Sequence, residues 1–532
     1  MGTRAGERRH EVTKLAVIRS SPNVVDGSRS TGDLVLEADV CIVGTGAGGA
    51  VTAATLARAG LSVLMLEEGG YYTHADFTMR EKDTEPRLYQ EGMTRTTADG
   101  AIAILQGRAV GGTTVVNWTT CFRTPEDVVE HWKKKHGVAG FAYADLVPHY
   151  EAIEQRLAIA KVGYGSMNPN NRTLHDGCTK LGWSVDTLRR NVHACMQTGF
   201  CHLGCPVNAK RSMLVTMIPD AIDAGAKLVF RARADRFEVE AGAVKALRGT
   251  LLDAEGRKPT GRTFTVKAKR FVVSGGAINS PALLLRSGID GGGLVGTRTF
   301  LHPVVGSAAV YEEAIEPSRG APQSAASHHF AHRGDEVGFF LEAVPWYPAL
   351  ISTTTPGFGP AHEAAFVQSP HTALHIAIAI DGFHDDVPGG RVTLRESGAP
   401  LIEYPIVPKL WNAFRFAQKR LAEMQFASGA KTVRTIHEVP VVMHGKVDEA
   451  AIDAARWEKG SVPVSTAHQM GGCRMGDDPK TSVVRSEDLR CHTVSNLHVI
   501  DGSVFPTSLG VNPQQSIYGL ARLVATRIAA AK

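Results

Sequence analysis

Short apolar runs that end in glycine recur at three distant places along the chain. Val40–Val43 ends at Gly44, and an Ala-rich segment and a further apolar run follow, over residues 50–59 and 62–66. This order predicts a strand, a glycine turn, a helix and a second strand. The runs 270–274 and 497–500 are likewise followed by Gly275-Gly276 and Asp501-Gly502. We therefore predict one domain assembled from three separated stretches of sequence.

The segments between these stretches carry a different pattern. Residues 335–343 and 372–380 alternate or are continuously apolar, as sheet strands are. We expect them in a second, α+β domain that contains an antiparallel sheet. The first domain would comprise residues 37–125, 225–300 and 460–532, and the second residues 126–224 and 301–459. Residues 1–36, which are polar and poorly periodic, are expected to form an N-terminal arm.

Composition excludes several classes of protein. Of the 532 residues, 43% are hydrophobic and 21% are charged, which is typical of a globular chain. The net charge is only +5, so we expect no nucleic-acid partner. No stretch reaches the roughly 18 consecutive apolar residues of a membrane span, and Thr13 and Lys14 interrupt the only early apolar run, so no signal peptide is expected. The predicted location is cytoplasmic, with the eight cysteines mostly reduced.

The glycine turn after the first predicted strand reads Gly44-Thr45-Gly46-Ala47-Gly48-Gly49. A GxGxxG motif between a strand and a helix allows a tight turn, close approach of a pyrophosphate to backbone N–H groups, and close helix–sheet packing. Glu67 ends the next predicted strand, where a carboxylate can accept hydrogen bonds from ribose hydroxyls. The fold class is therefore α/β, with a Rossmann-like dinucleotide-binding domain beside the second domain.

Four further motifs follow in the same chain. They are GRAVGGTTVVNW over residues 107–118, GAINSP over 276–281 with Ser287-Gly288, HQMGGCRMG over 468–476, and DGSVFP over 501–506. Together these motifs resemble the glucose–methanol–choline (GMC) family of flavoproteins, from about Asp39 to Ala529. One position departs from the family, because Asp290 stands where its second signature usually has glycine. The resemblance implies an FAD-dependent oxidoreductase acting on a CH–OH group.

The resemblance also implies which residues hold the cofactor. Asn117 has an alternative role as a loop cap, and the FAD is expected to be non-covalent, because no histidine lies in the Gly111-Gly112 region. By resemblance, Gly44, Gly46, Gly49 and Glu67 would hold the ADP half, Gly111, Gly112 and Asn117 would run beside the isoalloxazine ring, and Asp501 and Gly502 would lie near the ribityl and pyrophosphate part.

Two residues are implied to act on the substrate. The counterparts of His468 in the family face the flavin N5, and imidazole titrates near neutral pH, so His468 is the predicted acceptor of the hydroxyl proton. Asn512 would orient the substrate, since an amide donates or accepts a hydrogen bond without ionising. Its alternative role is to shape the turn before Pro513.

Cys195, Cys201 and Cys205 form the one ambiguous motif, with the spacing C-x5-C-x3-C. A similar spacing occurs in the cluster-bearing subunits of some bacterial GMC glucose dehydrogenases, so an iron–sulfur cluster is one interpretation. Packed or redox-sensitive cysteines are the other, and no further metal site is predicted.

Substrate, electron acceptor and reaction class stay open at this point. A small-molecule alcohol substrate is expected, and the aromatic residues Phe339, Phe340, Trp346, Tyr347 and Phe358 favour a hydrophobic one. Oxygen or another acceptor, such as an electron-transfer partner subunit, would reoxidise the flavin. The alternatives are a non-redox lyase of the hydroxynitrile lyase type or a decarboxylase on the same fold, and a NAD-dependent dehydrogenase, which would purify colourless.

Overall fold

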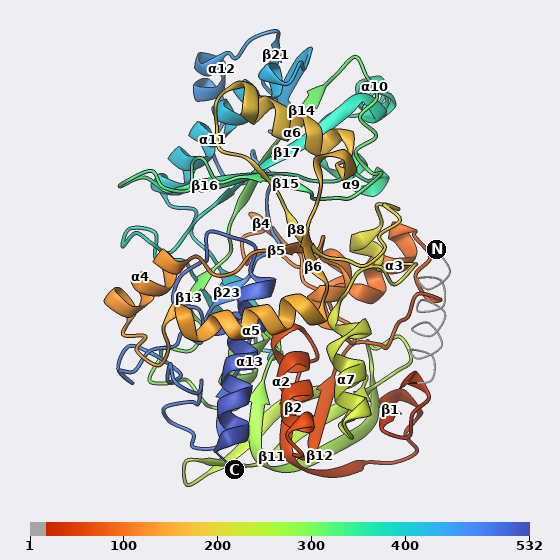
Figure 1. The fold of residues 1–532 in the computed structure, drawn as a ribbon, viewed down its shortest axis with the longest axis vertical. Helices are drawn as coiled ribbons and strands as arrows, with labels where there is room; N and C mark the ends of the chain where they lie inside the picture. The colour runs from red at the N-terminus through yellow and green to blue at the C-terminus, as the bar shows by residue number, and fades with distance from the viewer. Residues whose placement is uncertain (1–17, 532) are drawn as a thin grey trace.

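The computed structural model describes residues 18–531. An eight-stranded sheet forms the lower half of the molecule (Figure 1). Its strands follow the order β1, β9, β3, β2, β12, β11 and β10, and β24 pairs with the end of β12. The bounds are β1 Val24–Asp26, β2 Leu34–Val43, β3 Val63–Glu67, β9 Lys227–Phe230, β10 Ala232–Glu240, β11 Ala243–Leu252, β12 Pro259–Val273 and β24 Leu497–Val499.

The predicted assembly from three stretches of sequence is present in this sheet. Strands β2, β3 and β24 and the end of β12 are parallel to one another, so their carboxyl ends meet at one edge. In parallel sheets, ligands bind outside that edge. The three glycine-containing segments that follow β2, β12 and β24 therefore lie together.

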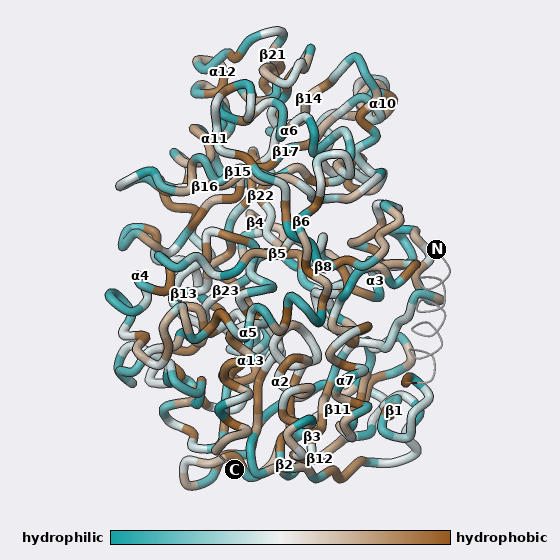
Figure 2. Tube along the Cα trace, viewed as in Figure 1, coloured by the Kyte–Doolittle hydropathy of each residue, from teal (hydrophilic) through white to brown (hydrophobic). Residues whose placement is uncertain are grey.

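Helices α2 (Ala47–Arg58), α13 (Gln514–Ala530), α7 (Met217–Asp223) and α5 (Tyr143–Arg156) form one layer, in which α2 contacts α13 and α7, and α13 contacts α5. The apolar residues of this layer and of the sheet form one large buried cluster. Figure 2 shows hydrophobic stretches inside both halves of the molecule and mostly hydrophilic outer loops.

The expected N-terminal arm is wrong from residue 24 onward. Val24–Asp26 pairs in parallel with β9, and β2 already begins at Leu34, so this segment extends the sheet. Residues 1–17 lie outside the described part. The segment has many polar residues, and an arm was expected for that reason. However, β1 is an edge strand and the start of β2 is half-exposed, and such strands need few apolar side chains.

A nine-stranded sheet forms the upper half (Figure 1). It follows the order β21, β20, β14, β17, β16, β15 and β7, with β22 beside β14 and β4 beside β22. Only the β22–β4 pair is parallel. The bounds are β4 Ile102–Ile104, β7 Asp186–Thr187, β14 Val304–Val310, β15 Ala325–Ser327, β16 Phe339–Ala343, β17 Thr372–Ala379, β20 Thr432–Thr435, β21 Val442–His444 and β22 Val464–Thr466. The predicted fold class is thereby confirmed.

The linear boundaries between the two domains differ from the expected ones. Helix α7, expected in the second domain, packs on α2 of the first, whereas β4 and β22, expected in the first, belong to the upper sheet. Residues that cross over in this way join the two halves into one body with the site between them.

The remaining elements cover these sheets. Helices α6 and α11 contact each other and the strands of the upper sheet, and none of the helices in residues 18–531 is long and apolar enough to span a membrane. The bounds are α3 Glu81–Leu88, α4 Glu126–His136, α6 Pro169–Lys180, α8 Gly276–Arg286, α9 Pro348–Thr354, α10 Pro360–Val367, α11 Pro408–Ala427 and α12 Glu449–Ala454, with a four-stranded sheet of β13 Thr297–Phe300, β18 Gly390–Leu394, β19 Pro400–Glu403 and β23 Met470–Gly471, and a three-stranded sheet of β5 Thr120–Cys121, β6 Ile159–Lys161 and β8 Arg189–Asn191.

Candidate active site

A cavity of about 840 Å³ runs from the glycine turn after β2 to the face of the upper sheet. This volume lies within the range of about 300–1,000 Å³ that is usual for small-molecule and cofactor sites. Of the predicted site residues, Gly49 and Gly111 lie behind the cavity wall. The others line it, namely Gly44, Gly46, Glu67, Gly112, Asn117, Asp501, Gly502, His468 and Asn512.

The glycine turn is shaped by close backbone approaches. Gly44 has φ +99°, a conformation that favours glycine, and a Cβ on Gly48 would lie 1.8 Å from the carbonyl oxygen of Ile500. A Cβ on Gly49 would meet the carbonyl oxygen of Gly44 at 2.0 Å, so Gly49 serves the packing of α2 rather than the cavity. No side chain caps the first turn of α2, whose free N–H groups are suited to bind a phosphate.

A second glycine segment packs directly on this turn. Gly111 has φ +101°, and its N–H donates to Thr45 Oγ1 at 3.0 Å. A Cβ on Gly112 would lie 2.7 Å from the Cα of Gly46. A Cβ on Gly46 would meet the Cα of Gly112 only at 3.9 Å, so it is the glycine at position 112 that allows the two loops to approach closely.

Glu67 lies buried at the end of β3, as predicted. Its carboxylate accepts hydrogen bonds from the N–H of Thr45 at 3.1 Å, from the Thr45 hydroxyl at 2.7 Å and from the N–H of Gly69 at 2.9 Å. Burial raises the pKa of Glu67, although these hydrogen bonds oppose the shift. In this structure the carboxylate thus fixes the glycine turn, and it also lines the cavity where a ribose would lie.

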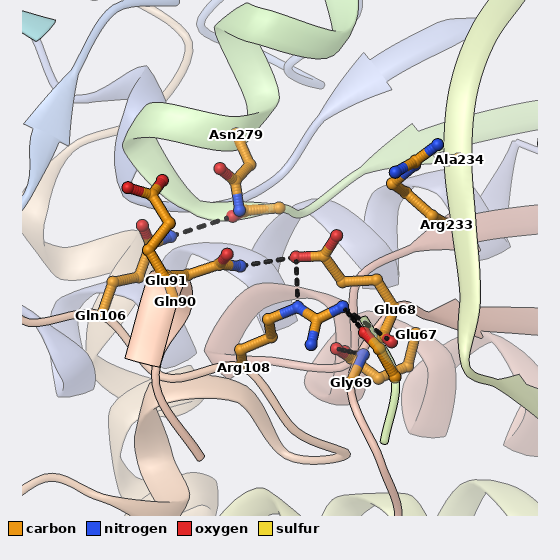
Figure 3. A network of polar contacts seen from close by, with 12 residues as sticks. Glu67, Glu68, Gly69, Gln90, Glu91, Gln106, Arg108, Arg233, Ala234 and Asn279 are labelled. Atoms are coloured by element: carbon orange, nitrogen blue, oxygen red, sulfur yellow. Dashed lines mark hydrogen bonds and ion pairs between the residues drawn. The ribbon is translucent and has the colours of Figure 1, made fainter. Parts of the chain in front are cut away.

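The next residue, Glu68, belongs to a polar network that the sequence did not reveal. Figure 3 shows its carboxylate facing both Gln90 and Arg108, at 2.5 Å from Gln90 Nε2 and 3.4 Å from Arg108 Nε. Burial opposes ionisation, but the Arg108 guanidinium and Gln90 outweigh it and lower the pKa of Glu68. Glu68 and Gln90 come from separate segments, so only their approach in space identifies them as lining of the same end of the cavity, with Arg108 behind them.

Asp501 closes the cavity beside α8. It accepts from the N–H of Gly276 at 2.8 Å and from the hydroxyls of Ser280 and Ser503, both at 2.5 Å. Its carboxylate therefore ties the Gly275-Gly276 turn at the start of α8 to the end of strand β24. Gly502, the next residue, lines the cavity. Burial raises the pKa of Asp501.

Asn117 makes the contacts of a loop cap, and its predicted place beside the isoalloxazine ring stays a prediction. Its amide donates to Gln514 Oε1 at 2.7 Å and accepts from the N–H of Thr119 at 3.3 Å, as a loop cap does. The side chain also lines the cavity.

His468 and Asn512 lie side by side, as the sequence predicts. Nε2 of His468 is 3.3 Å from Nδ2 of Asn512, and Oδ1 of Asn512 has no hydrogen-bond partner although it is buried. Burial lowers the pKa of His468 to about 4, so the imidazole is neutral near pH 7. An alcohol oxygen placed at this pair can exchange hydrogen bonds with both side chains.

A second histidine, which the sequence gave no reason to select, supports His468 from behind. The Nδ1 atoms of His302 and His468 are 3.2 Å apart, and Nε2 of His302 lies 3.2 Å from the N–H of Gly510. His302 is fully buried and has φ +46°, a strained backbone that marks a constrained position. His302 therefore fixes the orientation of the His468 ring.

The substrate end of the cavity is formed by one face of the upper sheet. Its lining there is mostly apolar, and Trp346 is the only one of the five aromatic residues considered above that contributes to it, while Phe358 is 89% exposed. The exception on this face is Glu342 of β16, which is fully buried. The apolar lining residues are Trp118, Val304, Val344, Trp346, Leu350, Leu374, Ile376, Ile378 and Ile436. Glu342 had one sequence signal, since it is the only charged residue in the apolar run from Val337 to Val344.

Cys195, Cys201 and Cys205 surround a much smaller cavity, of about 10 Å³. That space holds about one water molecule, so an iron–sulfur cluster does not fit between the cysteines as they stand. Lys210 explains the segment better. Its ammonium donates to the carbonyl oxygens of Val115 and Cys201 at 2.6 Å and of Asn117 at 2.9 Å, which anchors the cysteine segment to the second glycine loop.

Comparisons with known proteins agree with this geometry. The GMC oxidoreductase family matches at residues 86–304 for its N-terminal part and 387–521 for its C-terminal part. The chain belongs to the GMC oxidoreductase family, and it is an FAD-dependent oxidoreductase of this class.

Individual relatives span most of the chain. An uncharacterized GMC-type oxidoreductase of Mycobacterium tuberculosis is 34% identical over 93% of this chain and 76% of its own length. A long-chain-alcohol oxidase of Arabidopsis thaliana is 28% identical over 93% of this chain and 69% of its own length. The solved structure of pyridoxine 4-oxidase from Mesorbium loti has a TM-score of 0.67 and 19% identity, covers 92% of this chain and 98% of its own, and shows the fold alone.

Proposed function

We propose that this protein oxidises a hydrophobic alcohol to an aldehyde or ketone with non-covalently bound FAD. The main support is that His468 and Asn512 lie side by side in the cavity. The same cavity is lined by the glycine loops and by the apolar face of the upper sheet. FAD, when bound, accepts the hydride of the carbinol carbon. The glycine loops, the N-terminus of α2 and Glu67 would hold its ADP half.

The residues of the chain supply binding and orientation. The apolar face of the upper sheet would remove the alkyl part of the alcohol from water, which stabilises the complex by about 25 cal/mol per Å² of apolar surface. His468 and Asn512 would hold the hydroxyl oxygen. The similarity to a long-chain-alcohol oxidase supports the same choice of substrate class. Oxygen or another electron acceptor would reoxidise the flavin.

The role of His468 as acceptor of the hydroxyl proton stays a prediction of the sequence. It requires a lone pair on Nε2, the nitrogen that faces Asn512. An acceptor at this place is worth about 10²- to 10⁴-fold in rate.

The test is anaerobic mixing of the purified protein with a panel of alcohols of increasing chain length. We expect a yellow protein whose flavin absorbance bleaches, fastest with the more hydrophobic alcohols. A yellow protein that no alcohol bleaches would favour a non-redox lyase, and a folded, colourless protein would refute the proposal.

A further inference from the structure

Glu342 has the most unusual environment of the carboxyl groups that line the cavity. Its Oε2 accepts from Gln323 Nε2 at 2.5 Å and lies 3.5 Å from Asn512 Nδ2, but its Oε1 is buried without any hydrogen-bond partner. A buried polar atom left without a partner costs about 1–3 kcal/mol. Such an atom beside the substrate position needs a functional explanation.

The hydrogen bonds around His468 bear on the same question. The N–H of Gly510 can only donate, so Nε2 of His302 accepts and the neutral His302 carries its hydrogen on Nδ1. That hydrogen points to Nδ1 of His468, which must then accept. A neutral His468 consequently carries its own hydrogen on Nε2 and has no lone pair there to take a proton. In this tautomer Nε2–H of His468 and the Nδ2 amide of Asn512, 3.3 Å apart, are both donors that cannot bond to each other, and both can donate to a substrate oxygen.

We propose that Glu342 is a further catalytic residue, whose free Oε1 accepts the hydroxyl proton of the alcohol while Nε2–H of His468 and Asn512 hold the oxygen. This inference rests on the proposed alcohol oxidation. The O–H bond breaks and its proton forms the carboxylic acid of Glu342. The carbinol C–H bond breaks with its electron pair, which leaves as hydride to the flavin, and the C–O bond becomes a carbonyl.

Among the ionisable groups near the substrate position, Glu342 is the one whose pKa lies near neutral pH. Burial raises the pKa of Glu342 to about 8, and the hydrogen bonds from Asn512 and Gln323 oppose this shift only in part. The ionisable groups on neighbouring elements are His375 on β17, which bonds to Thr173 and Gln425, His328 after β15, which stacks on Phe340 of β16, and His468 with His302 beyond Asn512. Burial lowers the pKa of His375, His328 and His468 to about 4 and that of His302 well below its usual value, so all four are neutral where Glu342 titrates.

The decisive experiment is the pH profile of anaerobic flavin reduction in the holoenzyme, for wild type, Glu342→Gln and His468→Gln. In wild type we expect the rate to rise with pH through about 8, since the carboxylate is the active form. In Glu342→Gln the rate should fall by at least about 10²-fold and lose this pH dependence. In His468→Gln the rate should also fall, but the rise near pH 8 should remain.

Thermal unfolding supplies a readout that needs no turnover. The folded pKa of Glu342 lies above its unfolded value, so its contribution to stability is present at low pH and is lost as the pH rises through about 8. Wild type should therefore lose Tm relative to Glu342→Gln between about pH 5 and about pH 8, and should lose no more above that. Glu336→Gln, an exposed carboxylate six positions earlier on the chain, is the matched control and should behave as wild type in both measurements.

Two results would overturn the inference. One is Glu342→Gln with a near-normal rate and an unchanged pH profile; the other is a rise near pH 8 that vanishes in His468→Gln and persists in Glu342→Gln. If Glu342→Gln does not fold, Glu342→Asp keeps the carboxylate, and a profile that does not shift with it counts against the inference. A wild type that no alcohol reduces refutes the proposed function instead.

Discussion

The two ends of the cavity treat their polar groups in opposite ways. At the end formed by the glycine loops, Glu67 and Asp501 are saturated by hydrogen bonds from the chain itself. At the substrate end, Oε1 of Glu342 and Oδ1 of Asn512 are buried without partners. Under the proposed function, the saturated groups would fix a backbone that must match a rigid cofactor, whereas the free acceptors would be kept for a substrate that comes and goes. The contrast would then separate a binding region from a reacting region within one cavity.

The largest effect should come from breaking the saturated end. In Gly48→Ala the added Cβ would lie 1.8 Å from the Ile500 carbonyl oxygen, and because this obstacle is backbone, no side-chain rotation can relieve the clash. We expect almost no soluble yellow protein, measured as yield and flavin absorbance. Gly163→Ala, where a Cβ meets nothing within 4 Å, should give normal yield. A normally folded, yellow Gly48→Ala would show that the contact is not restrictive.

At the reacting end, His468→Ala should slow anaerobic flavin reduction by at least about 10²-fold and leave the protein yellow. The rate should fall whether His468 accepts the hydroxyl proton or only hydrogen-bonds the substrate oxygen. Stopped-flow measurement of flavin reduction therefore tests whether His468 contacts the substrate, and not which of these two roles it has. His332→Ala, whose side chain is 84% exposed, is the control and should reduce normally. Near-normal reduction of His468→Ala would remove His468 from the mechanism.

Asn512→Ala should have a smaller effect. It removes one neutral hydrogen bond to the substrate, about 1–1.5 kcal/mol, which corresponds to roughly a tenfold loss. Because Asn512 orients the alcohol, KM should rise as well as kcat fall, and steady-state kinetics would separate the two. A loss as large as that of His468→Ala would mean that the amide does more than orient.

The smallest effect is expected away from both ends. Cys195→Ser replaces a thiol at the small cavity, and the free energy of unfolding should change by less than about 1 kcal/mol. The flavin reduction rate should not change, and an iron and sulfide assay of wild type should be negative. Stoichiometric iron would restore the cluster interpretation.

Much of the fold was predictable because its signals are local. Runs such as Val40–Val43 and Phe271–Val273 are apolar throughout, since parallel strands are buried on both faces. The order strand, glycine turn and helix identifies the nucleotide edge without knowledge of any distant contact. The strands of the N-terminal segment were not predicted from such local signals. An edge strand such as β1 is stabilised by pairing with β9 rather than by its own side chains.

The sequence by itself determined the family, the glycine loops and the motif residues His468 and Asn512, because each of these is written in consecutive residues with a fixed backbone requirement. Only the tertiary structure decided that His302 orients His468 and that Glu342 lies beside Asn512. These contacts join positions 166 and 170 residues apart. Burial and the absence of a partner, which give Glu342 its chemistry, are properties of packing and not of sequence spacing.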